Sequence, residues 1–375
     1  MIRHIPGAQL IGWAARLRLP VAVFAEGGGG RPGDTDRYYS GNLITPAFNL
    51  FGKLSGLAPL VGIASGRCFA GNAVLLGCCD VVIATENANI GMGGPAMIEG
   101  GGLGTYAPTE IGPIDVQEKN GVVDIVAEDE AHATAVARQL LSYFQGDIDA
   151  WETVDQSGLR DAIPEDRRWA YPVRKIIETI ADAGSFLELQ RIYGRSSIHG
   201  CIRVEGKPVA LISNDGQQMG GAVGAQASEK AARFLQICDA FRLPVLSLTD
   251  TPGFMVGPDS EVQGAVRRMS SLFIAGAKLQ SPVVAIFLRK GYGLGAIAMT
   301  HGSCDAPVTA APRPPPGPSP PRPRHAPPHP LRPPRKPPRR LPPLHPPHHP
   351  LSHAPPSLHP PRAHPPASHH PLHPT

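Results

Sequence analysis

Two glycine-rich turns, at residues 65–73 and 288–296, contain the residue types of this chain that could do chemistry. A basic residue, an aromatic residue, small residues and an alanine align between them at an offset of 223 positions. Glycine and alanine leave backbone N–H groups accessible, and each turn leads into small and apolar residues typical of the start of a helix. N–H groups at such a junction can hold a developing negative oxygen. The turns therefore predict two oxyanion sites.

The similarity between the turns extends into the chain before them. Residues 18–21 read Arg-Leu-Pro-Val and recur unchanged at residues 242–245, at an offset of 224. In each copy an apolar, β-branched run after a proline predicts a buried strand that ends at the turn. We infer a duplicated strand–turn–helix unit and an α/β fold class. The positions that align are Pro59 with Pro282, Val61 with Val284, and Ile63 with Ile286.

The composition divides the 375-residue chain into a folded part and a tail. Residues 306–375 contain 29 of the 44 prolines and no acidic residue, so we expect a disordered or polyproline-like tail over 308–375. Residues 1–305 hold 26 basic and 31 acidic residues, so the formal charge of +4 belongs to the tail. That charge does not indicate a basic groove on the folded part, and we expect no nucleic-acid partner.

The cysteines and the apolar segments limit the classes of protein to which this chain can belong. The adjacent pair Cys78 and Cys79 is not a CxxC motif, and no second pair stands at zinc-ligand spacing. We therefore expect reduced core thiols and no metal site. No apolar run of 18 residues could span a membrane, and the first twenty residues do not read as a secretory signal. The expectation is a cytoplasmic enzyme with no membrane partner.

Hydrophobic periodicity and turn residues predict the order of the elements. In the first copy we expect helices at 8–18, 44–56 and 127–144, and strands at 21–24, 59–65 and 80–84. In the second copy we expect strands at 201–204, 208–213, 245–248 and 282–288, and helices near Ser228 and at 261–279. A connector at 145–197 carries one helix at 173–183. The expected domains are 1–144, 145–197 and 198–307, followed by the tail at 308–375.

Two further glycine segments leave alternatives open. Residues 26–34 lack the Gly-Lys-Ser/Thr ending of a nucleotide P-loop, so a tight loop is favoured over phosphate binding. Residues 91–97 form another small-residue turn. This turn either lines the same pocket as the first turn or is an ordinary loop.

Five motifs stand in order in the second half: Lys-Pro-Val at 207–209, Ala-Ala-Arg-Phe at 231–234, Cys-Asp-Ala-Phe at 238–241, Asp-Thr-Pro-Gly-Phe at 250–254, and Arg-Lys-Gly-Tyr-Gly at 289–293. Their order and wording resemble the carboxyltransferase (beta) subunit of biotin-dependent acyl-CoA carboxylases. The resemblance covers about residues 8–307 and is looser in the first half. It implies two crotonase-like halves, each a ββα spiral. The first half would hold acyl-CoA and the second carboxybiotin.

The chemistry implied by the resemblance is transfer of a carboxyl group from N1 of biotin to the α-carbon of an acyl-CoA thioester. Negative charge develops on the thioester oxygen and on the ureido oxygen of biotin, and two backbone oxyanion holes meet that need. The departing biotin nitrogen can take the α-proton, so no catalytic triad or carboxylate pair is required. The assigned residues are Ala70 and Gly71 for the thioester hole, Leu294 and Gly295 for the biotin hole, and Gly94, Pro95, Gly293 and Ala296 for substrate binding.

The resemblance also implies the cofactor and the partners. Biotin, in its carboxylated form, would be carried on a partner subunit or domain, and biotin carboxylase and the biotin carboxyl carrier would be the partners. The two halves of the site would meet across a subunit interface, which implies a homo-oligomer. Arg289 and Lys290 either contact a phosphate or the pantetheine of the substrate, or are solvated or paired.

Three other functions remain open at this stage. A biotin-dependent acyl-CoA decarboxylase would share every motif. A hydratase or isomerase of the wider crotonase group would need a catalytic carboxylate near the thioester, and the sequence places none after either turn. The family pattern also extends beyond both ends of the matched region, so we expect incomplete halves, unpaired strand edges and loss of independent activity. A non-catalytic remnant that only oligomerises is therefore the third alternative.

Overall fold

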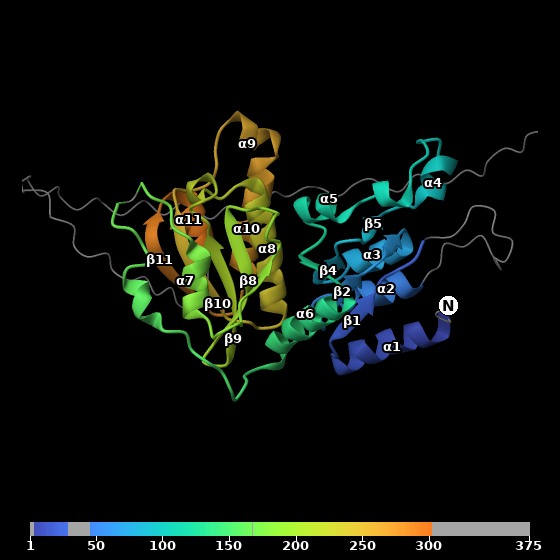
Figure 1. Ribbon diagram of the computed structural model, residues 1–375, viewed down its shortest axis with the longest axis horizontal. Helices are drawn as coiled ribbons and strands as arrows, with labels where there is room; N and C mark the ends of the chain where they lie inside the picture. Colours follow the sequence, from blue (N-terminus) through green and yellow to red (C-terminus); the bar gives the residue numbers. More distant parts are fainter. Residues whose placement is uncertain (1–3, 29–45, 167, 302–375) are drawn as a thin grey trace, which may run out of the picture. The chain divides into compact units, whose positions relative to one another are not determined.

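The computed structural model describes residues 4–28, 46–166 and 168–301 (Figure 1). The expected tail at 308–375 and most of the glycine loop at 26–34 lie outside the described residues. The first half comprises α1 (His4–Leu17), β1 (Val21–Phe24), α2 (Pro46–Gly52), β2 (Leu60–Ala64), β3 (Arg67–Phe69), α3 (Gly71–Gly77), β4 (Val81–Thr85), β5 (Asn89–Gly91), α4 (Pro95–Gly100), α5 (Ile114–Lys119), β6 (Ile125–Ala127) and α6 (Glu130–Ser142).

The remaining elements belong mainly to the second half. They are α7 (Val173–Ile180), β7 (Leu187–Leu189), β8 (Ser197–Val204), β9 (Lys207–Asn214), α8 (Ala225–Ala240), β10 (Val245–Thr251), α9 (Pro258–Val262), α10 (Ala265–Lys278), β11 (Val283–Gly291) and α11 (Gly293–Thr300). The α/β class expected from the sequence is confirmed.

The first half is built on a parallel sheet in the order β1-β2-β4-β6, with β3 and β5 forming a separate parallel pair. Every residue of β2 and β4 is buried. Continuous apolar runs are typical of parallel strands covered on both faces, and β-branched residues suit that environment. The predicted strands at 59–65 and 80–84 are confirmed within one residue at every boundary.

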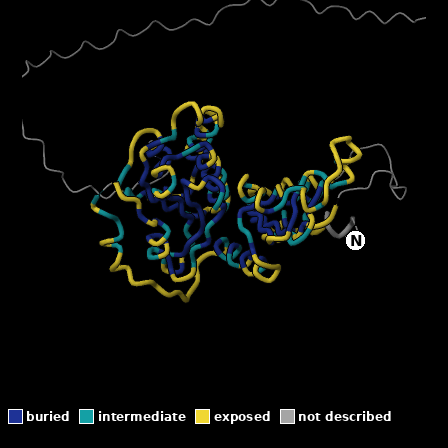
Figure 2. Tube along the Cα trace, turned by 45° about the horizontal axis from the view of Figure 1, so that its top comes forward, coloured by how far each residue is buried: buried dark blue, intermediate teal, exposed yellow. Residues whose placement is uncertain are grey.

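The second sheet has the order β11-β10-β9-β8-β7. β8 pairs antiparallel with β7 and with β9, whereas β10 pairs parallel with β9 and with β11. Alternate residues along β9 enter different cores: Leu211 packs with the apolar face of α7, while Ala210 and Ile212 pack with that of α8. The sheet is therefore sandwiched between helices, with α7 on one face and α8 with α10 on the other (Figure 1). Its inner strands β8 and β10 are almost entirely buried, whereas most of the edge strand β11 is only partly buried (Figure 2).

The duplication seen in the sequence is confirmed by strand register. Val21 of β1 pairs with Leu60 of β2, and Val245 of β10 pairs with Val283 of β11. The pairs differ by 224 and 223 positions, which are the offsets of the sequence repeat. Further along the chain, Gly27 bridges Cys68 and Thr251 pairs with Gly291, again at offsets of 224 and 223. Both copies therefore use one backbone plan up to the turn.

Several predicted elements differ from the structure. The single helix predicted over 261–279 is wrong, because Gly264 adopts a left-handed φ of 69° and separates α9 from α10. The helix predicted over 44–56 ends at Gly52, and turns follow it. The first turn contains a short strand, β3, which the sequence did not indicate. Strand β7 lies within the expected connector and pairs with β8. The domain limits remain a prediction.

Arg233 of α8 links the second half to the first. Its guanidinium forms an ion pair of 3.3 Å with Asp124 and donates to the carbonyl oxygens of Cys79 and Asp80. Apolar residues of α6 share a core with α8 and with the second sheet. These contacts tie residues that follow the first turn to helix α8 of the second half.

The first copy stores backbone strain at Ala70. Ala70 has φ 54° and ψ −124°, and the equivalent residue of the second copy, Gly293, has φ 61°. Non-glycine residues with positive φ cost on the order of 1–3 kcal/mol. The same bend therefore costs the first copy more than the second.

Ala70→Gly is expected to raise the free energy of unfolding by about 1 kcal/mol, because glycine adopts positive φ without a Cβ penalty. Urea denaturation followed by circular dichroism measures this. Ala135→Gly, in the exposed middle of α6, is the control and should lower stability by about 1 kcal/mol. Equal destabilisation by both changes would contradict the strain at Ala70.

His199 is a buried histidine in the core of the second half. It stacks on Phe234 at 5.7 Å between ring centroids, and its Nε2 lies 2.8 Å from the Ser197 hydroxyl. Burial, with the nearby Lys230, holds the pKa of His199 well below its usual range. Protonation of His199 is therefore disfavoured in the folded state.

Acid should destabilise the fold through His199. Below about pH 6.5 His199 binds a proton in the unfolded chain but stays neutral in the folded one. The free energy of unfolding therefore falls as the pH decreases. His199→Phe removes the titrating imidazole. The slope of the unfolding free energy against pH, measured between pH 6.5 and 5, should therefore fall by up to about 1.4 kcal/mol per pH unit. Phe234→Leu should lower stability without changing the slope. An unchanged slope in His199→Phe would refute the assignment.

Candidate functional site

The first turn changes an extended strand into a helix within one residue. Phe69 donates to the Gly27 carbonyl at 3.0 Å, and Ala70 donates to the Gly91 carbonyl at 3.1 Å. The bend at Ala70 then starts α3 at Gly71. Within the described part of the chain, no group accepts a hydrogen bond from the Gly71 N–H. The N–H of Gly71 is thus available to a ligand, whereas that of Ala70 is already used.

The 91–97 turn lies beside the first turn. β5 pairs with β3 so that Gly91 is opposite Phe69. A Cβ on Gly94 would lie 3.3 Å from the Phe69 ring, which shows close approach of the two segments. Gly94 precedes α4 without a side-chain cap, and Pro95 occupies the first helical position. The 91–97 turn therefore lies beside the first turn, and its role in lining the same pocket stays a prediction.

Apolar side chains surround the first turn. The Phe48 ring would lie 3.1 Å from a Cβ on Gly71, so this side chain covers the start of α3. Four exposed residues of the segment after β5 add apolar surface nearby in sequence. They are Met92, Met97, Leu103 and Tyr106.

The second turn repeats the construction of the first. Tyr292 donates to the Thr251 carbonyl at 3.2 Å, as Phe69 does to Gly27, and α11 begins at Gly293. The first backbone donor of α11 with an acceptor is Ala296, which bonds to the Tyr292 carbonyl at 3.3 Å. Among the residues described, nothing accepts from the N–H groups of Leu294 or Gly295. Both predicted donors of the second hole are therefore without an acceptor, Leu294 on an exposed residue and Gly295 on a buried one.

Gly295 packs directly on the loop that follows β10. A Cβ at this position would lie 2.5 Å from the Gly253 carbonyl carbon and 2.6 Å from the Phe254 nitrogen. Real Cβ atoms are not found so close to backbone, so a side chain at Gly295 would displace the loop. Ala296 is buried beside Gly295, whereas Leu294 is 62% exposed. The two sequence motifs 250–254 and 289–293 thus meet at this turn.

Asp250 fastens the end of β11. Its carboxylate accepts from the Lys290 N–H at 3.0 Å and from the Tyr171 hydroxyl at 2.8 Å, and it pairs with the Arg289 guanidinium at 3.3 Å. Arg289 also lies over the Tyr171 ring at 5.0 Å. The Lys290 ammonium donates to the Gly220 carbonyl. Arg289 and Lys290 are therefore paired within the protein, the second of the two roles considered for them.

Glu26 is the counterpart of Asp250 and was missed as a site residue. It stands 224 positions earlier, and its carboxylate accepts from the backbone N–H of Ser65 at 3.3 Å and from the Ser65 hydroxyl. Asn72 donates to the Glu26 carbonyl at 2.8 Å. Glu26 and Asp250 each stand two positions after a predicted strand, at 21–24 and at 245–248. Aligning the two copies at these strands would have identified both carboxylates. One carboxylate thus holds each turn.

The buried cysteines do not supply a nucleophile. Burial raises the pKa of Cys68, Cys79 and Cys201 to about 12. The five cysteines in the described ranges are free thiols, and four of them are buried. The expectation of reduced core thiols is confirmed for these residues. What the two turns offer chemically is backbone N–H donors, which suit stabilisation of negative oxygen.

The structure is thus a duplicated α/β chain with one candidate oxyanion site in each copy. Residues 10–312 match the family described as Carboxyl transferase domain. The chain belongs to this family. No helix in the described ranges has the length and apolar character needed to cross a membrane.

Named relatives agree with this membership. The chain is 31% identical over 268 residues to the methylmalonyl-CoA carboxyltransferase 12S subunit of Propionibacterium freudenreichii, covering 69% of this chain and 51% of that protein. It is 34% identical over 273 residues to the propionyl-CoA carboxylase beta chain of Rhodococcus erythropolis, covering 70% and 57%. The chain therefore spans about half the length of these relatives.

Solved structures show the same fold. A single-chain, multi-domain long-chain acyl-CoA carboxylase matches at 56% identity with a TM-score of 0.77, covering 80% of this chain and 30% of that chain. The transcarboxylase 12S hexamer with bound methylmalonyl-CoA matches at 27% identity and a TM-score of 0.71, covering 81% and 61%. The crotonase-like α/β fold expected from the motifs is therefore the fold of the described chain.

Asp250→Asn should destabilise the fold by about 3–5 kcal/mol, because it leaves the buried Arg289 guanidinium without its charged partner. Asn retains an acceptor for the Lys290 N–H, so the measured loss reports the ion pair with Arg289 together with the hydrogen bond from Tyr171. Urea unfolding measures the change, with Asp259→Asn on the exposed start of α9 as control. A loss below about 1 kcal/mol would mean that Asp250 does not hold the turn.

Proposed function

We propose that this chain acts as the carboxyltransferase component of a biotin-dependent acyl-CoA carboxylase. The observation that carries the proposal is the pair of turns in equal register, each ending in a helix start with free N–H groups. A reaction with two developing oxyanions requires two such sites. Family membership and the names of the relatives agree with this activity.

Gly71 is the proposed donor for the thioester oxygen, and the Gly94 segment lies beside it. Ala70 remains part of this hole as the residue that bends the chain, because its own N–H is bonded to Gly91. The exposed apolar residues after β5 would contact the pantetheine or acyl part of the substrate. Pro95 has no N–H and could contribute only packing.

Leu294 and Gly295 are the proposed donors for the ureido oxygen of biotin. The turn fits that group, because free N–H groups converge at a helix start and glycines at 293 and 295 leave no side chain over the backbone. Ala296, the proposed neighbour of these donors, is buried. Carboxylated biotin would supply the carboxyl group, and its N1 would receive the proton of the substrate α-carbon. No acid or base of this chain is required.

Biotin carboxylase and a biotin carboxyl carrier are the proposed partners, and the proposed working unit is a homo-oligomer. Relatives are named as beta subunits of biotin-dependent carboxylases, and the matched 12S structure is a hexamer. A decarboxylase would use the same two turns and differs only in the direction of net transfer. The non-catalytic alternative also stands, because the chain spans about half of its relatives.

Purified chain should be assayed for carboxyl transfer from carboxybiotin to acetyl-CoA and propionyl-CoA, alone and with a biotin carboxylase and carrier. Transfer to either thioester supports the proposal. Net loss of carboxyl groups from malonyl-CoA or methylmalonyl-CoA under the same conditions favours the decarboxylase. Absence of both reactions, with intact binding of acyl-CoA, favours the non-catalytic alternative.

Gly71→Pro should lower kcat/KM for carboxyl transfer at least a hundredfold. Proline suits the first position of a helix but has no N–H, and loss of one oxyanion donor costs roughly 2.7–4 kcal/mol. Gly71→Ala is the matched control, since it keeps the N–H and adds similar bulk against Phe48. Far-UV circular dichroism should be unchanged in both. Equal activity of the two variants would remove the Gly71 N–H from the mechanism.

A further inference from the structure

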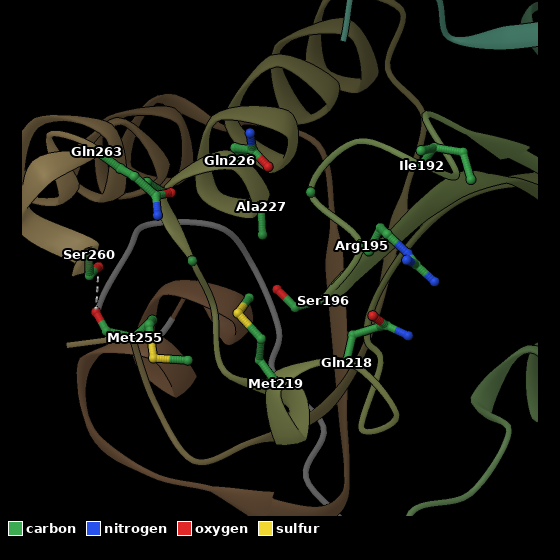
Figure 3. A pocket seen from close by; sticks show the side chains of 13 residues that line it. Ile192, Arg195, Ser196, Gln218, Met219, Gln226, Ala227, Met255, Ser260 and Gln263 are labelled. Carbon is green, nitrogen blue, oxygen red and sulfur yellow. Dashed lines mark hydrogen bonds between the residues drawn. The ribbon is translucent and has the colours of Figure 1, made fainter. Parts of the chain in front are cut away.

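A pocket at the start of α8 is separate from the two turns. Its volume is about 300 Å³, at the lower end of the range for small-molecule sites. Four segments line it: residues 192–196 before β8, the loop before α8, the start of α8, and the loop and helix from Met255 to Gln263 (Figure 3). Residues that are far apart in the sequence thus form one cavity.

Helix α8 presents backbone donors to this pocket. It is 16 residues long, and its N-cap, Gly224, has no side chain to cap it. The first N–H of α8 with a backbone acceptor is that of Ser228, which bonds to Gly224 at 3.0 Å. In the part of the chain that the structure describes, Ala225 and Gln226 donate to no other group. The start of a helix carries a partial positive charge, so these donors favour an anion.

Ser196 provides an independent observation. Ser196 is 1% exposed, and its hydroxyl has no hydrogen-bond partner among the described residues. In Figure 3 the hydroxyl points into the pocket, toward the side where Ala227 and Met219 lie. The adjacent Ser197, also buried, bonds to His199 and to the Ser213 carbonyl. A buried hydroxyl without a partner is costly, so Ser196 indicates a missing acceptor in the pocket.

The charge and the walls of the pocket define the ligand class. Arg195 is the one charged residue among the thirteen that line the pocket, and it lies exposed at the rim. Ile192, Met219 and Met255 add apolar wall. Methionine adapts to ligands of irregular shape. A small anion with an aliphatic part matches both the donors and the wall.

We propose that this pocket binds a small organic carboxylate with a short aliphatic chain. The carboxylate accepts from the Ser196 hydroxyl and from the free N–H groups at the start of α8. Its chain lies against the methionines, and Arg195 adds long-range attraction at the rim. This site is distinct from the proposed acyl-CoA and biotin sites, and the inference does not depend on the proposed function.

The site borders the second turn through one loop. Met255 donates to the Val223 carbonyl, and Val223 donates to the Gly253 carbonyl, both at 3.0 Å. Gly295 packs on Gly253 from the other side. A ligand in the pocket is therefore separated from the second turn only by residues 253–255.

Valerate binding to the purified 375-residue chain tests the proposal, by isothermal titration calorimetry and thermal shift. Valeramide, which has the same chain without the charge, and inorganic phosphate are measured in parallel. We expect saturable valerate binding with a dissociation constant of about 1 mM or tighter. Valeramide and phosphate should bind at least about tenfold more weakly, because one lacks the charge and the other lacks the chain.

Ser196→Ala should weaken valerate binding by about tenfold or more, since it removes a hydrogen bond to a charged group. It should fold at least as well as the wild type, because the removed hydroxyl has no partner. Arg195→Gln should weaken binding severalfold and reduce its dependence on salt. Arg191→Gln, outside the pocket, and Ser270→Ala, on exposed α10, are the matched controls and should bind normally.

Four results would overturn the proposal. Absence of saturable binding by valerate would mean that the pocket holds only water. Equal binding of valeramide would exclude recognition of an anion. Tighter binding of phosphate would replace the carboxylate class with a phosphate class. Unchanged affinity in Ser196→Ala would place the ligand elsewhere.

Discussion

Both sites depend on one backbone hydrogen bond in each copy. It joins the residue just before the bend of the turn to the chain at the end of the neighbouring parallel strand, β1 in the first copy and β10 in the second. Phe69 bonds to Gly27 and Tyr292 bonds to Thr251. Each bond extends a parallel strand pair past the point where the sheet ends. The next residue must therefore leave the sheet abruptly, with positive φ, and a helix begins at once. Free N–H groups at that helix start are the consequence.

The two copies meet this constraint with different side chains. Glu26 holds the first turn through Ser65, and Asp250 holds the second through the backbone of Lys290 and the side chains of Arg289 and Tyr171. The second anchor is more buried and includes an ion pair, so a change there carries a larger penalty. The bend itself is made by Gly293 in one copy and by Ala70, with strain, in the other. Strain of this kind persists only where the surrounding structure enforces it.

A site built from backbone donors explains why chemistry-bearing side chains are absent from both motifs. The arginine and lysine of the second motif are used to fix the strand end, and the nearby thiols have raised pKa values because they are buried. Preorganised N–H groups cost no rearrangement when charge develops on a bound oxygen. The two turns offer backbone N–H groups alone, whereas the α8 pocket combines the N–H groups of a helix start with the buried hydroxyl of Ser196.

The sequence by itself determined the duplication, the order of most strands and the location of both turns. It could do so because parallel strands appear as continuous apolar runs, and because a repeat offset is a local property of the chain. The family was indicated separately, by the resemblance of five ordered motifs to a known family. The sequence also placed Leu294 and Gly295 at a helix start, where their N–H groups are free.

Only the tertiary structure decided which donors are available and which charges are paired. Ala70 and Gly71 are alike in sequence terms, but strand β5 takes the N–H of Ala70 and leaves that of Gly71. Asp250 and Arg289 are 39 positions apart, and Ser196 and Ala225 are 29 apart. Their pairing in space follows from strand order and helix packing, which hydrophobic periodicity does not encode. The break between α9 and α10 was missed for a related reason, because a left-handed glycine and a helical glycine look the same in a sequence.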